Sequence, residues 1–267
     1  MSKKNRIEQD SIGKIAVSNE NFWGAQTQRS LKNFKIGNHI MPIEIIRALA
    51  IIKLSCAKVN SKQKILSNKL SAAIVGASKL VLSGKYDRHF PLSVWQTGSG
   101  TQTNMNVNEV IANLANKKLT GKLGTNSPVH PNDHVNKSQS TNDSFPSAIN
   151  IATAILVKDN LIPSMKRLQT TLKSHSKKWD KIIKVGRTHL QDATPLSLGQ
   201  EFSGYEAMIS SNIKRVEQSF NSLLNLAQGG TAVGSGLNTK KNFDKFVVNE
   251  ISKIAKIKFK PAINKFQ

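Results

Sequence analysis

The chain of 267 residues has little of several residue types, and each shortage excludes a class of protein. Its one cysteine, Cys56, permits no internal disulfide and no zinc or iron–sulfur site built from several cysteines. A lone cysteine also fits a reducing compartment. No apolar run approaches the ~18 uncharged residues of a membrane span, and the basic N-terminus lacks a signal peptide's apolar stretch. We therefore expect a soluble, cytoplasmic protein.

Acidic residues are also scarce: 16 Asp and Glu face 39 Lys and Arg, which gives a net charge of +23. Such a charge raises nucleic-acid binding as an alternative, testable by salt-sensitive binding to random DNA. However, residues 93–116 contain no Lys or Arg, and residues 185–209 carry one Arg against three acidic residues. The excess is mostly lysine rather than the arginine that favours base recognition, and only 6% of residues are aromatic. We favour lysines on solvated helix faces, with no nucleic-acid partner.

Alternation of strands with helices is missing as well, so nothing in the sequence supports a parallel sheet. Helical periodicity dominates, with 38% hydrophobic residues available for a core. We expect helices at residues 43–59, 66–82, 104–119, 145–179 with a kink near Pro163, and 242–257. An apolar stripe from Leu198 to Ala227 predicts a further long helix. The fold class is therefore mainly α, built on an extended bundle of long helices.

Polar segments without lysine interrupt this helical chain, and the first covers residues 97–104. Its glycines permit a tight turn just before a helix, whose free N–H groups attract an anion such as a carboxylate. Ser99 and Thr101 add hydroxyl donors on either side of Gly100. The alternative is a flexible turn with an ordinary N-cap.

Three more polar segments lie at residues 130–143, 186–195 and 229–236. His130 and His134 suggest a metal site, which we reject because no third ligand stands at a recognisable spacing. Ser140, Thr141 or Asn142 could simply cap the next helix, but the density of polar groups exceeds that need. His189 can move a proton near neutral pH, or it can be a histidine satisfied by hydrogen bonds at a helix junction. Residues 229–236 lack the preceding strand of a dinucleotide site, so we interpret them as a loop of the bundle.

Taken together, these segments closely resemble the class II fumarase family of the fumarase/aspartase superfamily of lyases. The resemblance lies in FWGAQTQR at 22–29, GTQTNMNVNEV at 100–110, HPNDH at 130–134, GRTHLQD at 186–192 and GGTAVG at 229–234. Aspartases, the close alternative as ammonia-lyases, typically have Gln in place of His189 and Val in place of Thr194. They also depart from the Thr101-Gln102 pair.

The resemblance implies reversible hydration of fumarate to (S)-malate in the tricarboxylic acid cycle, without a metal or other cofactor, by a homotetramer. By position, the residues expected to bind substrate carboxylates are Ser99, Gly100, Thr101, Ser140, Thr141, Asn142 and Thr188. His189 is expected to handle the proton. A second, non-catalytic dicarboxylate site, the B site, is expected at His130, Pro131, Asn132 and Asp133. Positioned donors of this kind would stabilise the enolate-like charge that forms beside a carboxylate.

The family's third region, a Gly-Ser-Ser loop followed by Met-Pro-x-Lys-x-Asn, does not occur in the chain. We therefore expect an N-terminal lyase domain at 1–138 and a partial central bundle at 139–267, with the remaining bundle helices and C-terminal domain absent. Such a C-terminally truncated chain is expected to have little hydratase activity alone. A non-catalytic dicarboxylate-binding or scaffold remnant is the alternative.

Overall fold

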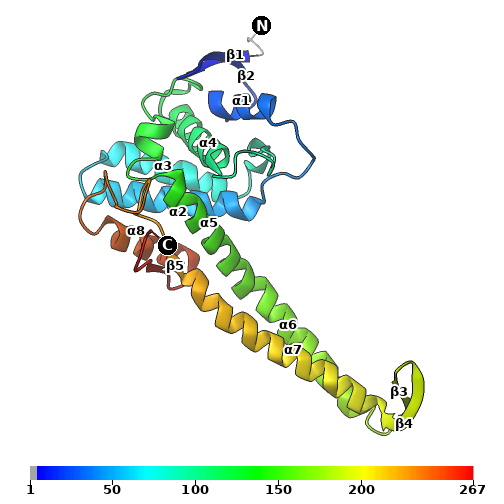
Figure 1. The fold of residues 1–267 in the computed structure, drawn as a ribbon. Coiled ribbons are helices and arrows are strands. Elements are labelled where there is room, and N and C mark those ends of the chain that lie inside the picture. The colour runs from blue at the N-terminus through cyan, green and yellow to red at the C-terminus, as the bar shows by residue number, and fades with distance from the viewer. Residues whose placement is uncertain (1–4, 267) are drawn as a thin grey trace. The chain divides into compact units, whose positions relative to one another are not determined.

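The structure, a computed structural model, describes residues 5–266, which group into two compact units. The first unit contains the described residues up to Ala152 and those from Leu224 onward, and the second is Thr153–Leu223 (Figure 1). The domain boundary expected after residue 138 stays a prediction.

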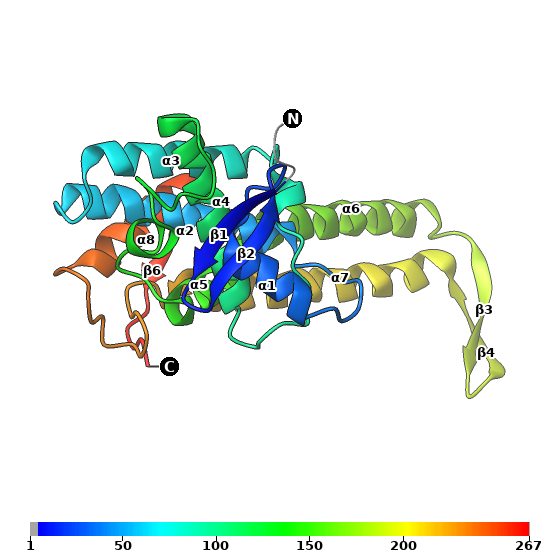
Figure 2. The same cartoon turned by 90° about the horizontal axis from the view of Figure 1, so that it is seen from above.

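The first unit is mainly helical and begins with an antiparallel hairpin. Its strands are β1 (Asn5–Asp10), β2 (Gly13–Ser18), β5 (Asn225–Leu226) and β6 (Lys260–Pro261). Its helices are α1 (Ala25–Asn33), α2 (Ile43–Lys62), α3 (Asn68–Leu82), α4 (Thr101–Thr120) and α8 (Phe243–Ala255), with short 3-10 and π turns at Asp87–His89 and Pro131–Val135. Helix α5 (Thr141–Leu156) begins in the first unit. Both views place α2 beside α3 and α8 (Figures 1 and 2).

Helices α2 and α4 form the centre of the first unit because they offer no continuous polar face to solvent. Every residue of α4 from Thr103 to Asn116 is buried, including five asparagines. Buried amides need partners, and three of these asparagines, Asn106, Asn113 and Asn116, bind the backbone of surrounding segments. Asn113 donates to the carbonyl of Phe22 at 2.9 Å, and Asn116 exchanges two 2.8 Å bonds with the backbone of Val129. The polar residues of α4 thus hold the loops that surround the site.

The second unit consists of a helix pair and a hairpin. A π-helical turn (Val157–Leu161) leads into α6 (Ile162–Lys178), which packs against α7 (Leu198–Phe220), and a 3-10 turn (Asn221–Leu224) follows. Between the helices, β3 (Ile183–Thr188) pairs with β4 (Gln191–Ser197). Thr188 faces Gln191 across a two-residue turn in which His189 and Leu190 have φ of 53° and 61°. Two positive φ values are typical of a type I′ hairpin turn.

The mainly helical fold class is confirmed, and several local expectations need correction. The polar segment around His189 is a β-hairpin, not a helix junction. Helix α4 begins at Thr101, three residues before the expected start, and α7 ends at Phe220 although the apolar stripe continues to Ala227. The irregularity expected at Pro163 lies one turn earlier, in the π-helical Val157–Leu161, and Pro163 occupies the tolerant first turn of α6.

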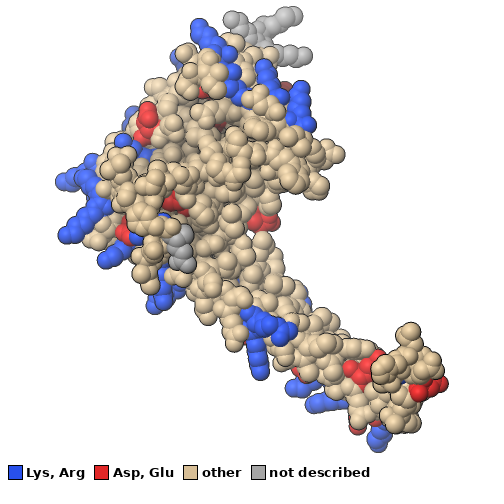
Figure 3. Space-filling view, viewed as in Figure 1, with Lys and Arg blue, Asp and Glu red and all other residues tan. Residues whose placement is uncertain are grey.

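Within residues 5–266, no helix combines the length and apolar character needed to cross a membrane. On the face shown in Figure 3, Lys and Arg side chains stand in separate groups with uncharged surface between them. This distribution agrees with lysines on solvated faces rather than with one continuous basic track.

Candidate active site

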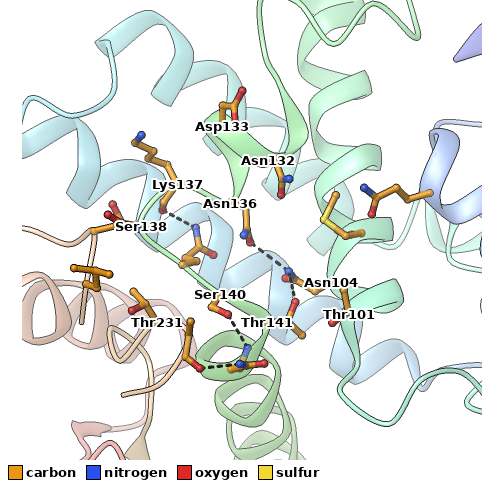
Figure 4. Close-up of a pocket in the computed structure, with 17 residues that line it drawn as sticks. Thr101, Asn104, Asn132, Asp133, Asn136, Lys137, Ser138, Ser140, Thr141 and Thr231 are labelled. Carbon is orange, nitrogen blue, oxygen red and sulfur yellow. Dashed lines mark hydrogen bonds between the residues drawn. The ribbon is translucent and has the colours of Figure 1, made fainter. Parts of the chain in front are cut away.

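A cavity of about 890 Å³ in the first unit brings together several of the residues selected from the sequence (Figure 4). Three chain segments supply most of its wall: the start of α4, the start of α5, and the turn and loop between them. The lining residues are Gln26, Thr101, Asn104, Met105, Asn132, Asp133, Asn136, Lys137, Ser138, Gln139, Ser140, Thr141, Asn142, Thr231, Ala232, Leu237 and Asn238.

The start of α4 reaches the cavity through Thr101, which follows Gly100. Gly100 has φ of +75°, and a Cβ there would lie 2.5 Å from the ring of Phe145, so both backbone and space favour glycine. Gly100 has no side chain to cap the helix, and the Gln96 side chain accepts from the backbone N–H of Thr103 at 3.0 Å. The hydroxyls of Ser99 and Thr101 lie 2.9 Å apart. Hydroxyl donors and the positive end of the helix dipole make this corner suited to an anion.

The start of α5 supplies a second set of polar groups. The Ser140 hydroxyl accepts from the backbone N–H of Asn142 at 3.2 Å, and the Asn142 amide donates to the carbonyl of Ala232 at 2.7 Å. Thr141 lies between them and lines the cavity. Two helix starts, α4 and α5, therefore present N–H dipoles and hydroxyls to one space.

Buried Asp143 fixes the glycine-rich loop at residues 229–236 against the start of α5. Its carboxylate accepts from the backbone N–H groups of Ser140 at 3.0 Å, Gly229 at 3.0 Å and Thr231 at 2.9 Å. Burial raises the pKa of Asp143, and these donors oppose the rise. The loop thereby places Thr231 and Ala232 in the cavity wall.

Lys53, which the sequence reasoning missed, lies directly behind this wall. Its side chain is fully buried in the middle of α2. Its Nζ donates to the side-chain oxygens of Asn104 at 2.7 Å, Asn136 at 2.7 Å and Gln139 at 2.9 Å. Burial lowers the pKa of Lys53 to about 8. The signal in the sequence was one lysine at the centre of an apolar helix run, where lysine is rarely found unless paired.

The predicted B-site residues share a π-helical turn but divide between two hollows. Asn132 and Asp133 line the large cavity, whereas His130, Pro131 and Asn132 line a neighbouring hollow of about 320 Å³. His130 Nδ1 accepts from the N–H groups of Asn132 at 3.3 Å and Asp133 at 3.1 Å. His134 Nδ1 accepts from the N–H of His130 at 2.8 Å, and burial lowers the pKa of His134. Among the described residues, no cluster of three His, Cys, Asp or Glu suits a metal ion.

The remaining predicted residues, Thr188 and His189, belong to the second unit. Thr188 lines a hollow of about 420 Å³ within that unit, together with Arg187 and Glu201. His189 is exposed in the turn of the β3–β4 hairpin. The structure thus gathers Thr101, Ser140, Thr141 and Asn142 in the first unit, while these two residues stand on another element.

Comparison with known proteins gives consistent matches. The model of a family described as lyase matches residues 13–267. The chain is 55% identical over 265 residues to a fumarate hydratase class II of Rickettsia conorii, covering 99% of this chain and 57% of the relative. It is 52% identical over 262 residues to a fumarate hydratase class II of Bradyrhizobium diazoefficiens, covering 98% and 55%.

A crystal structure of recombinant class II fumarase from Schistosoma mansoni matches with a TM-score of 0.95 and 43% identity, covering 98% of this chain and 58% of that chain. The chain therefore spans a little over half the length of the relatives it matches.

Proposed function

Because the chain belongs to the lyase family whose model matches residues 13–267, we propose that it serves the reversible hydration of fumarate to (S)-malate. Relatives at 55% and 52% identity carry the name fumarate hydratase class II, which favours this reaction over that of an ammonia-lyase. The reaction adds the hydroxyl of water to one alkene carbon and a proton to the other. The proposal includes a place in the tricarboxylic acid cycle, a cytoplasmic location and assembly as a homotetramer.

One observation carries the proposal: the starts of α4 and α5 meet at a single cavity, with the buried ammonium of Lys53 behind its wall. A dicarboxylate is small, doubly negative and rich in acceptor oxygens, so it matches hydroxyl donors, helix dipoles and a cation. Removing the C3 proton of malate places extra negative charge on the adjacent carboxylate. Donors already fixed in place stabilise that charge without reorganising.

In this proposal, the substrate carboxylates are bound by the residues at the starts of α4 and α5, which are Ser99, Gly100, Thr101, Ser140, Thr141 and Asn142. Thr188 also binds substrate, and His189 handles the proton, as the resemblance implies. Residues His130, Pro131, Asn132 and Asp133 form the second dicarboxylate site.

Titration calorimetry with fumarate, (S)-malate and L-aspartate tests the proposal. Fumarate and (S)-malate should compete for one site and bind more tightly than aspartate. Thr101→Val should weaken fumarate binding about tenfold by removing a hydroxyl donor to an anion. The matched control is Thr120→Val at the opposite end of α4, where the Thr120 hydroxyl donates to the Asn116 carbonyl. Preference for aspartate would favour the ammonia-lyase, and absence of dicarboxylate binding would reject the proposal.

A further inference from the structure

Lys53 occupies an unusual position for a charged side chain. It is among the largest side chains of residues 5–266 with an exposed fraction below 2%, and its ammonium contacts three neutral amide oxygens. All three partners, Asn104, Asn136 and Gln139, line the large cavity. A buried cation held by neutral groups is costly, because no full negative charge compensates it at contact distance. The nearest carboxylate that acts on it, Asp143, raises its pKa through space and makes no hydrogen bond to Nζ. A carboxylate bound in the adjacent cavity would add a second negative charge.

The Lys53 ammonium also fixes the orientation of the neighbouring side-chain amides. Lysine can only donate, so the oxygens of Asn104 and Asn136 must point to Nζ and their NH₂ groups must point away. The NH₂ of Asn104 then donates to the Thr141 hydroxyl at 3.0 Å and to the Asn136 oxygen at 3.3 Å (Figure 4). Gln139 is fixed in the same sense, because its NH₂ donates to the carbonyls of Val135 at 3.0 Å and Lys137 at 3.1 Å.

This orientation sets the polarity of Thr141. Its oxygen already accepts a hydrogen from Asn104, so its own O–H hydrogen remains available to donate into the cavity. With Asn104 flipped, the amide oxygen would face Thr141 and would take that hydrogen instead. The direction of hydrogen bonding therefore runs from Lys53 through Asn104 to Thr141 and then to the cavity.

We propose that Lys53 is a positioning residue that makes Thr141 a hydrogen-bond donor to an anionic oxygen in the cavity and adds positive charge behind it. This inference rests on the proposed function, because the anion it addresses is the dicarboxylate. Lys53 does not touch the ligand: it orients Thr141 through Asn104, and its charge acts on the anion through space.

Calorimetric titration with fumarate tests the proposal on two lysines of α2. Lys53→Met keeps the unbranched stem and removes the charge, and it should weaken binding about tenfold or more. Lys62→Met is the matched control, since Lys62 is 70% exposed and pairs with Glu250 at 3.4 Å. It should change the affinity less than twofold. Equal affinities of wild type and Lys53→Met would overturn the proposal.

A double-mutant cycle separates action through Thr141 from general damage to the fold. Thr141→Val should weaken fumarate binding, and Lys53→Met should weaken it much less in the Thr141→Val background than in the wild type. Additive effects would show that Lys53 does not act through Thr141. If Lys53→Met fails to fold, the fumarate affinity of Thr141→Val tests the proposal instead. An unchanged affinity in Thr141→Val would contradict a Thr141 hydroxyl that donates to the ligand.

A ligand-free measurement keeps this inference distinct from the proposed function. In wild-type protein, the side-chain NH₂ hydrogens of Asn104 should exchange slowly with solvent in NMR spectra, and Lys53→Met should accelerate their exchange. Unchanged exchange would overturn the positioning role. Failure of the wild type to bind fumarate, with exchange accelerated in Lys53→Met, would instead overturn the proposed ligand and leave the positioning role supported.

Discussion

Helices α2 and α4 bury most of their residues, whereas α6 buries none and α7 buries only Gly199 and Ile213. Within the second unit the two helices pack against each other and leave apolar side chains exposed, among them Leu168 of α6 and Met208 of α7 at 47% and 55%. Both regions show clear helical periodicity. The periodicity identifies the apolar face of a helix, while burial depends on how many other elements cover that face.

The largest contrast should appear when one apolar side chain is shortened in each unit. Ile52 in α2 is fully buried, so Ile52→Ala should lower the free energy of unfolding by about 3 to 4 kcal/mol through lost burial and the cavity left behind. Leu168 is 47% exposed, and Leu168→Ala should lower it by less than about 1 kcal/mol. Urea unfolding, with hydrogen exchange of α2 and α6 amides, measures both. Similar losses would contradict the comparison.

A buried carboxylate should make the first unit the more pH-sensitive region. Glu109 of α4 accepts from the backbone N–H groups of Gly24 at 2.8 Å, Gln26 at 2.8 Å and Thr27 at 3.1 Å, at the start of α1. Burial raises its pKa from 4.5 to about 7, although these donors lower it. Between those values the folded state holds more protons than the unfolded state. Its contribution to stability is therefore complete below pH 4.5 and is lost as pH rises toward 7.

Between pH 4.5 and pH 7, the free energy of unfolding should fall by about 3 kcal/mol because of Glu109. Urea unfolding between pH 4.5 and pH 7 should show it in the wild type and not in Glu109→Gln. The matched control in the second unit is Glu201→Gln, because Glu201 is solvated and its hydrogen bond with Lys184 lowers its pKa. If the stability of wild type and of Glu109→Gln depended on pH in the same way, Glu109 would have the same pKa in the folded and unfolded states.

Two glycines of α7 sharpen the comparison inside the second unit, where packing is limited to one helix pair. A Cβ at Gly199 would lie 2.4 Å from the backbone oxygen of Ser176 and 2.6 Å from the Cα of Asp180. Gly199→Ala should therefore force the segments apart and destabilise the unit by about 2 kcal/mol. A Cβ at Gly204 would meet no neighbouring segment within 4 Å, so Gly204→Ala should stabilise the unit by about 0.5 to 1 kcal/mol. Thermal unfolding should show a lower Tm for Gly199→Ala and a higher Tm for Gly204→Ala. Tm shifts of the same sign would contradict the close packing described at Gly199.

The long helices were predictable because their apolar periodicity extends over several turns. The nine-residue helix α1 and the two hairpins were missed because their patterns are short. Strands β3 and β4 have six and seven residues, and Gly186 and Pro195 interrupt any alternation in them. The register shifts between Val185 and Arg187, so the intervening Gly186 belongs to a bulge. A Cβ at Gly186 would lie 2.4 Å from the Thr194 carbonyl oxygen. That close approach of two backbones leaves no clear pattern in the sequence.

The candidate site was predictable in its polar segments but not in what supports them. The resemblance selected Thr101 and Thr141, whose roles stay predictions, and the structure places both on one cavity. Lys53 lies about fifty positions earlier in the sequence than Asn104, and only the packing of α2 against α4 brings them to 2.7 Å. Local periodicity contains no information about a contact between helices, so a buried lysine looks like an exception in an apolar run until the fold is known.

The smallest contrast concerns the helix starts of the two units. Ser197 and Gln200 form a reciprocal capping box on α7, with bonds of 3.0 Å and 2.8 Å, whereas the Ser67 hydroxyl accepts one bond from Leu70 at 3.3 Å on α3. Ser197→Ala should lower the free energy of unfolding by about 1 kcal/mol, and Ser67→Ala by about 0.5 kcal/mol. Helix α7 has few buried residues to compensate, so hydrogen exchange near its start should rise more than near the start of α3. Ser197→Asp keeps a hydrogen-bond acceptor at the cap, so it should restore most of the protection of the α7 amides from exchange. An equal rise in exchange at the starts of α3 and α7 would mean that tertiary packing does not determine how strongly a helix depends on its cap.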